Sequence, residues 1–352
     1  MRRGAELALT ATHDMNQETL TASPSESVVV ELTAVVVAVT ADEPRVLTVR
    51  AAVDAGRRGT LRLDALPAGP LQSVHRTLDQ GLRAYVEHQT RHTLGYVEQL
   101  YTFGDRDRDR RGTTVATAAR VLSIGYLGLV REAFPAGSEE AAWHDWYRYF
   151  PWEDWRHGRP VVLDLIEPKL AAWADAAESD GDRRARRERL SVTFAFADGT
   201  WNDERVLERY ELLYEAGLVP EASLKAADPD ALPGRHPMAG DHRRILATAI
   251  ARLRGKIKYR PVVFELMPPA FTLLQLQRTV EALAGVRLHK PNFRRLVEQQ
   301  GLVEETGAVT LDTGGRPARL VRFRREVLVE RTAAGIGLPG SRGAFSRRRR
   351  DG

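Results

Sequence analysis

The sequence predicts an α+β protein, and three observations support this class. The first 130 residues carry β-branched runs around one helical pattern, residues 133–236 carry helical patterns, and the end of the chain carries two helices followed by two strands. With 352 residues, 43% of them apolar and 28% charged, the chain can build at least one proper hydrophobic core. These proportions exclude a wholly disordered protein.

Strands and one helix are expected in the front part. Two β-branched runs in residues 28–49 flank residues 41–44 (ADEP), an arrangement typical of a hairpin. Apolar residues at helical spacing predict a helix within 71–92, and the runs at 96–103 and 121–130 predict two further strands. The expected order is therefore β-β-α-β-β.

Polar or turn-rich stretches lie around these elements. Residues 56–70 are expected to form a loop, and residues 106–111, where Arg and Asp alternate, a solvated loop. Residues 1–27 are polar and show no periodicity, so they are expected to be disordered. Residues 227–240 hold three Pro and two Gly and are expected to be a linker.

The absence of cysteine and of long apolar runs limits the possible chemistry. Without cysteine the chain has no disulfide, thiolate metal ligand or cysteine nucleophile. No apolar run approaches the roughly 20 residues that cross a membrane. We therefore expect a cytoplasmic protein without a membrane partner.

All six tryptophans lie between residues 133 and 236, together with two helical patterns at about 161–178 and 202–217 and a basic run at 183–189. Because large aromatic side chains usually become buried, core positions are the first interpretation of the tryptophans. A surface that stacks nucleic-acid bases is the alternative.

The end of the chain carries helix start and stop signals. Thr272 and Gln275 form a capping-box pattern, and the helix that follows is expected to stop near Gly285. Pro291 suits the first turn of a second helix. Two strands are then predicted at 302–311 and 316–324, on either side of a turn. This order predicts a winged helix-turn-helix, preceded by a helix at 241–256 and a short apolar strand at 261–267.

Positive charge concentrates in the same part of the chain. Residues 241–334 hold 18 Lys and Arg against 9 Asp and Glu, and residues 335–352 add five Arg. A basic rear part behind an acidic front part indicates polyanion binding. Because Arg pairs with guanine and Asn or Gln with adenine, the candidate base-reading residues are Asn292, Arg295 and Gln299. Lys290 and Arg294 are candidate phosphate contacts, and the hairpin residues Arg316, Arg319 and Arg322 are candidates to clamp the DNA backbone or to enter a minor groove.

The front part has the layout of a Nudix hydrolase site without its residues. Such sites cluster carboxylates on one helix face so that divalent cations can bridge a diphosphate. Residues 69–92 have the required length, but His88 and Gln89 stand where two metal-binding glutamates are expected, and only Glu87 nearby is acidic. His88 and His92, four residues apart, lack a third zinc ligand. The sequence therefore predicts no catalytic residue and no metal site.

Several segments resemble one known family. They are EQLYTFGD at 98–105, SIGYL at 123–127, YRPVVFEL at 259–266, PAFTL at 269–273, NFRR at 292–295 and RPARL at 316–320. These segments resemble, in order, the Nudix-related transcriptional regulators of NAD metabolism (the NrtR type). The resemblance covers roughly 28–131 and 240–325. It implies a homodimeric repressor that binds a pseudo-palindromic operator in double-stranded DNA and responds to ADP-ribose or a related nucleotide, without a required cofactor.

The resemblance implies an order of domains. A Nudix-like α/β/α sandwich that senses the ligand is expected at 28–132, with its closing helix and strand at 240–268. A Trp-rich, mainly helical insertion at 133–239 departs from the family pattern. The winged helix is expected at 269–326, and a basic disordered tail at 327–352.

Candidate ligand contacts in the front domain are an aromatic group and two cations. Tyr101, Phe103 and Tyr126 are candidates to stack on an adenine, and Arg76 and Arg83 to face a diphosphate. Glu98 completes the candidate set.

Two other functions remain open at this point. One is a divergent hydrolase of ADP-ribose or a dinucleotide, in which Glu98 or Asp105 would hold the metal. The other is a nucleotide-sensing scaffold whose winged helix binds protein.

Overall fold

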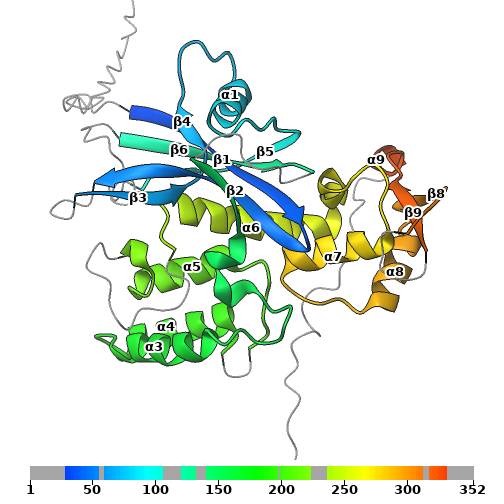
Figure 1. Ribbon diagram of the computed structural model, residues 1–352. Helices are drawn as coiled ribbons and strands as arrows, with labels where there is room; N and C mark the ends of the chain where they lie inside the picture. Colours follow the sequence, from blue (N-terminus) through cyan, green and yellow to red (C-terminus); the bar gives the residue numbers. More distant parts are fainter. Residues whose placement is uncertain are drawn as a thin grey trace, which may run out of the picture.

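A central β-sheet, a helical unit beneath it and a small C-terminal domain beside it make up the computed structural model (Figure 1). The structure describes residues 28–54, 59–105, 120–131, 140–196, 199–222, 236–311 and 317–330. The predictions of disorder at 1–27, of a solvated loop at 106–111 and of a tail beyond 330 fall outside these residues. Within them, no helix is long and apolar enough to cross a membrane.

The main sheet has seven strands, and β1 lies at its centre. The path runs β3-β2-β1-β6-β5, with β4 paired to β1 and β7 paired to β2. β1 and β6 are parallel, and residues 32–38 of β1 are all buried, because both faces of the sheet are covered. The strands are β1 (Val28–Thr40), β2 (Glu43–Asp54), β3 (Thr60–Ala65), β4 (Ala68–Pro70), β5 (Tyr96–Phe103), β6 (Arg120–Leu129) and β7 (Ala141–Asp145).

The predicted hairpin at 28–49 is confirmed, and the predicted loop at 56–70 is wrong. The β1–β2 turn has Ala41 and Asp42 at φ values of 52° and 64°, the left-handed pair that a two-residue hairpin turn requires. β3 and β4 occupy most of the expected loop. The first residues of β3 are exposed at the sheet edge, so this strand carries little of the apolar pattern by which strands are predicted.

Helices α1 (Leu78–Thr90) and α6 (His242–Tyr259) cover opposite faces of the sheet. Leu82 and Val86 of α1 pack with Leu32 in one core cluster. Ile245 of α6 packs with Val35 in another. The α/β/α layering expected of the front domain is therefore present.

α1 begins later than residue 71 because its N-cap is Thr77. The Thr77 hydroxyl accepts a hydrogen bond of 3.1 Å from the N–H of Gln80, which fixes the first turn.

The region between residues 140 and 222 contributes one strand to the sheet and a helical unit beneath it. Strand β7 belongs to the sheet, although the predicted boundary at 133 places it in the insertion. The helical unit contains η2 (Trp146–Arg148), η3 (Pro151–Glu153), α3 (Leu163–Asp175), α4 (Asp180–Phe194), α5 (Val206–Glu215) and η4 (Pro220–Ala222). Trp146, Trp152 and Trp201 are at most 2% exposed, which confirms the core interpretation for these three.

The C-terminal domain has the predicted order of helix, helix and hairpin. It contains α7 (Leu273–Ala284), α8 (Lys290–Gln299), β8 (Val303–Thr310), β9 (Ala318–Phe323) and α9 (Val327–Glu330). The capping box is present: Thr272 accepts from the N–H of Gln275 at 3.1 Å, and Gln275 accepts from the N–H of Thr272 at 2.7 Å. Gly285 ends α7 at a φ of 73°.

Two predictions for this part of the chain are wrong. The segment expected to be a strand at 261–267 is a 3-10 helix, η5 (Pro261–Leu266), which follows directly on α6 and packs Val263 into the core. The expected tail does not start at 327, because α9 is helical there and Val327 is fully buried.

Candidate nucleic-acid interface and effector site

Helix α8 separates an apolar face from a polar one. Phe293 and Val297, one turn apart, are buried against the rest of the domain. The five predicted DNA contacts on this helix are all exposed, namely Lys290, Asn292, Arg294, Arg295 and Gln299. The structure thus brings the helical half of the predicted interface together on one element.

The cations of α8 have no carboxylate paired with them in the described part of the chain. Among the described residues, Lys290, Arg294 and Arg295 form no ion pair. A cation without a protein partner can neutralise a phosphate without first losing an ion pair. This part of the surface is therefore suited to bind a polyanion.

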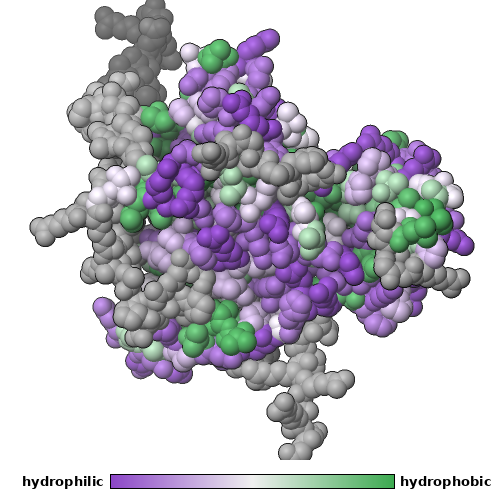
Figure 2. Space-filling model, viewed as in Figure 1, coloured by the Kyte–Doolittle hydropathy of each residue, from purple (hydrophilic) through white to green (hydrophobic). Residues whose placement is uncertain are grey.

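Two cations of the hairpin β8–β9 differ from those of α8 because they form ion pairs with carboxylates. Arg322 pairs with Glu304 at 2.6 Å, and Arg319 pairs with Glu305 at 2.7 Å. The strand register places Glu304 directly opposite Arg322. Arg316 lies outside the described residues. The hairpin also exposes Val309 and Leu311 by 60% and 74%, and Figure 2 shows a hydrophobic patch over this hairpin.

The candidate ligand contacts on the α1 side of the sheet have different surroundings. Arg76 is exposed in the loop before α1. Arg83 donates to Asp79 at 2.8 Å and to the carbonyls of Leu94 and Gly95, so it holds the α1–β5 connection. Tyr126 is 5% exposed within the core cluster under α1.

The remaining candidates lie on or toward the α6 side. Glu98 pairs with Lys256 of α6, and Phe103 is buried beside Arg244. Tyr101 is 62% exposed and packs edge-on against Phe103, with 5.4 Å between the two ring centroids. The pairing of β5 with β6 shifts register between Gln99 and Thr102, so the sequence pattern could not predict which face each side chain takes.

The described residues offer no assembled metal site. No group of three or more His, Asp or Glu side chains is placed to hold a metal among them. Glu87 and His88 are exposed on α1, and His92 lies beyond the end of that helix, where its Nδ1 is 2.9 Å from the carbonyl of Thr90.

Both alternative metal carboxylates are paired with cations of α6. Asp105 contacts Arg244, and Glu98 contacts Lys256. Burial alone would raise the pKa of Glu98, but hydrogen bonds from Lys256 and Tyr96 outweigh burial and lower the pKa.

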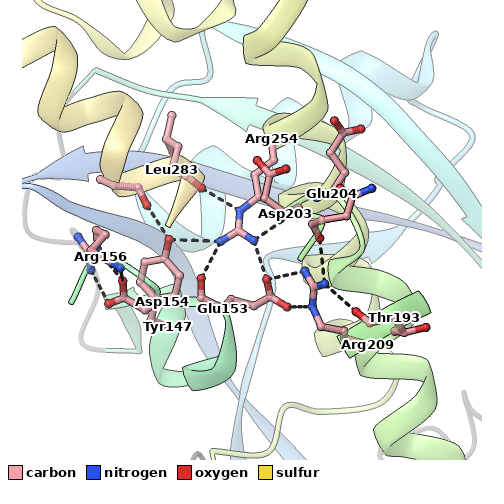
Figure 3. A network of polar contacts seen from close by, with 12 residues as sticks. Tyr147, Glu153, Asp154, Arg156, Thr193, Asp203, Glu204, Arg209, Arg254 and Leu283 are labelled. Atoms are coloured by element: carbon pink, nitrogen blue, oxygen red, sulfur yellow. Dashed lines mark hydrogen bonds and ion pairs between the residues drawn. The ribbon is translucent and has the colours of Figure 1, made fainter. Parts of the chain in front are cut away.

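Sequence reasoning missed a buried polar network beneath the sheet. Glu153 of η3 lies between Arg209 of α5 and Arg254 of α6, and all three side chains are fully buried (Figure 3). Arg209 donates to Glu153 at 2.5 and 2.9 Å, and Arg254 donates to it at 2.6 Å. These residues are 56 and 101 positions apart from Glu153, so no local motif could identify them.

Comparison with known proteins identifies the C-terminal domain. Residues 263–323 match the family model of the NrtR DNA-binding winged helix domain. The ADPR responsive transcriptional repressor NtrR of Acinetobacter baylyi is 44% identical over 86 residues, which are 24% of this chain and 34% of that protein. The chain therefore matches about a third of the length of this relative. The predicted winged helix and the resemblance to NrtR-type regulators are confirmed.

Two solved structures align with more of the chain at lower identity. One is Shewanella oneidensis NrtR in complex with a 27mer DNA, with 19% identity, coverage of 85% of this chain and 95% of that one, and a TM-score of 0.49. The other is a MutT/nudix family protein from Enterococcus faecalis, with 16% identity, coverage of 86% and 89%, and a TM-score of 0.48.

Proposed function

We propose that this chain, whose winged helix is of the NrtR type, is a DNA-binding transcriptional repressor of NAD metabolism genes that responds to ADP-ribose or a related nucleotide. The observation that carries the proposal is the exposed face of α8, where Lys290, Arg294 and Arg295 have no carboxylate partner among the described residues. The matched winged helix domain is named for DNA binding, and the Acinetobacter relative for its response to ADPR.

Within this proposal the residues of α8 divide into two roles. Asn292, Arg295 and Gln299 read base edges in the major groove, where their side chains can make paired hydrogen bonds. Lys290 and Arg294 contact phosphates, which positions the helix but adds little sequence preference. Arg316, Arg319 and Arg322 contact the DNA backbone from the hairpin. The protein acts as a homodimer on a pseudo-palindromic operator.

The front domain is proposed to bind its nucleotide without hydrolysing it. The cation partners of Glu98 and Asp105 support this view. The residues proposed to contact the nucleotide are Arg76, Arg83, Glu98, Tyr101, Phe103 and Tyr126.

Selection of genomic fragments on the purified protein, with and without ADP-ribose, tests the proposal. Selected duplexes should share a pseudo-palindromic sequence, and ADP-ribose should change the affinity of the protein for them. In a gel-shift assay Arg295→Glu should abolish binding to the selected duplex, because it places a carboxylate against base edges and phosphates. Arg184→Glu on the exposed surface of α4 is the matched charge reversal and should keep most of the affinity.

Two outcomes would overturn the proposal. If Arg295→Glu binds the selected duplex as the wild type does, α8 is not the reading helix. If the protein releases AMP from ADP-ribose with magnesium and selects no duplex, it is a hydrolase.

A further inference from the structure

The last carbonyls of α7 are capped by groups from outside the winged helix domain. A helix leaves its final carbonyls without intrahelical partners. Here the Tyr147 hydroxyl donates to Ala282 O at 2.7 Å, Arg254 Nε donates to Leu283 O at 3.0 Å, and the N–H of Trp155 donates to Gly285 O at 2.7 Å. We call these three donors the α7 cap.

The fit around Gly285 leaves no room for a side chain. A Cβ at this position would lie 2.5 Å from Glu153 O and 2.8 Å from both the Tyr147 hydroxyl and Arg254 Nη2. The φ of 73° also favours glycine here. The end of α7 therefore sits directly against the helical unit, and five residues later α8 begins.

Two donors of the α7 cap, Tyr147 and Arg254, belong to or contact the buried network. Arg254 bonds Glu153 and the carbonyl of Asp203, and its Nη2 lies 3.3 Å from the Tyr147 hydroxyl (Figure 3). Two guanidinium groups share one carboxylate, so the network carries excess positive charge. The negative end of the α7 dipole and the backbone carbonyls around it offset that charge.

The region that carries Tyr147 and Trp155, two donors of the α7 cap, is also fixed to the sheet. Strand β7, which precedes η2, pairs with β2 over five residues. Tyr149, two residues after Tyr147, donates to the buried Asp64 of β3 at 2.8 Å. At the β1–β2 turn, Arg156 donates to Asp42 O at 2.8 Å, and Asp42 pairs with Arg278 of α7 at 3.2 Å. A short run of direct contacts thus joins the sheet to α7.

We propose that the Trp-rich region, together with Arg254 of α6, fixes the orientation of the reading helix relative to the sheet, and that Tyr147 and Arg254 are the positioning residues. Neither residue lies on α8. They act through the last turn of α7, whose direction sets where α8 begins. A change of the sheet on nucleotide binding would reach α8 by the same contacts, and this part of the inference rests on the proposed function.

The variant Tyr147→Phe tests the inference because it removes one hydroxyl and keeps the aromatic ring. Hydrogen–deuterium exchange on the full chain is the first measurement, since it needs no DNA. The amides of 284–300 should exchange about 3- to 10-fold faster in the variant, the range expected for loss of the hydrogen bond to Ala282 O. The amides of β1 and β6 should be unchanged. Unaltered exchange in 284–300 would overturn the inference.

The second measurement is the affinity for a duplex that the wild type selects, with and without ADP-ribose. The ADP-ribose effect should shrink in Tyr147→Phe, which a purely stabilising contact would not cause. Tyr85→Phe is the matched control, because the Tyr85 hydroxyl also donates to a backbone carbonyl, Pro70 O, at 2.6 Å, away from α7. It should leave both readouts unchanged.

The two measurements separate the inference from the proposed function. Faster exchange in 284–300 in a protein that selects no duplex would support the positioning role and overturn the regulator. If the wild type selects a duplex and Tyr147→Phe retains the full ADP-ribose effect, the regulator is supported and the positioning role is overturned. Gly285→Ala, which intrudes on the α7 cap from the other side, should reproduce the exchange change.

Discussion

The buried carboxylate of Glu281 in α7 accepts a hydrogen bond of 2.9 Å from the backbone N–H of Leu288, across the turn that leads to α8. The same carboxylate accepts from Gln277 and from Arg287, each at 2.8 Å. Its side chain is 5% exposed. The turn before α8 is therefore held from the α7 side by one acidic residue.

Glu281→Ala should lower the free energy of unfolding by about 1–3 kcal/mol, the cost of leaving buried donors without an acceptor. The backbone N–H of Leu288 would lose its partner, whereas Gln277 would keep a bond of 3.0 Å to Leu288 O. Urea unfolding followed by circular dichroism measures the change. Glu265→Ala, at an exposed glutamate of η5, is the control and should change stability by less than about 0.5 kcal/mol. An equal effect of the two substitutions would contradict the role of Glu281.

Local signals explain which elements of the winged helix could be predicted. The capping box at Thr272 and Gln275 needs only residues three apart, so the start of α7 is readable from the sequence. The faces of α8 follow from Phe293 and Val297 in the same way. Pairing partners are not local, so the edge strand β3 could not be predicted from its own residues.

The basic run at 183–189 gave no apolar pattern from which the helix that contains it could be predicted. It lies within α4, yet the buried residues of this helix are confined to its last turns, from Leu190 onward. Its start is marked by Ser179, whose hydroxyl accepts from the N–H of Asp182 at 3.0 Å.

The candidate DNA face depended on one helix and could be predicted. The candidate ligand residues depended on the face of each strand and on a register shift, and Phe103 and Tyr126 pack into different core clusters.

Glu304→Gln should strengthen binding to any duplex. The substitution removes a negative charge from the hairpin and releases Arg322 from its ion pair at 2.6 Å. Because both changes raise the positive potential near DNA, we expect about 2- to 5-fold tighter binding at low salt and a smaller gain at high salt. Fluorescence anisotropy titrations across a salt series measure this. Glu188→Gln on α4 is the control, and a gain of the same size there would show a general charge effect only.

Glu153→Gln should be among the most destabilising single substitutions in this chain. It leaves Arg209 and Arg254, both fully buried, without a carboxylate partner among the residues that the structure describes. Loss of one member of a buried ion pair costs about 3–5 kcal/mol, and urea unfolding measures it. Arg189→Ala breaks a half-exposed ion pair with Glu215 and should cost less than about 1 kcal/mol. A small effect of Glu153→Gln would mean that the two guanidinium groups are solvated or repartnered.

Stability should fall between neutral pH and pH 5 because of His242. Its Nδ1 accepts a hydrogen bond of 2.7 Å from the N–H of Leu66, and burial lowers its pKa from 6.5 to about 4. Above pH 6.5 the imidazole is neutral in the folded and unfolded states. Below pH 6.5 the unfolded chain takes up a proton that the folded chain refuses, so the free energy of unfolding decreases until the pH falls through the folded pKa.

His242→Asn isolates this effect, because the amide oxygen can accept from Leu66 in place of Nδ1 and does not titrate. Burial lowers the pKa of His144 and His236 too, so the wild-type curve alone would mix three histidines. Between pH 7 and pH 5 the wild type should lose about 2 kcal/mol more than the variant, which is 1.36 kcal/mol for each pH unit below 6.5. Urea unfolding at both pH values gives the four free energies. Parallel losses in the two proteins would show that His242 does not carry the lowered pKa.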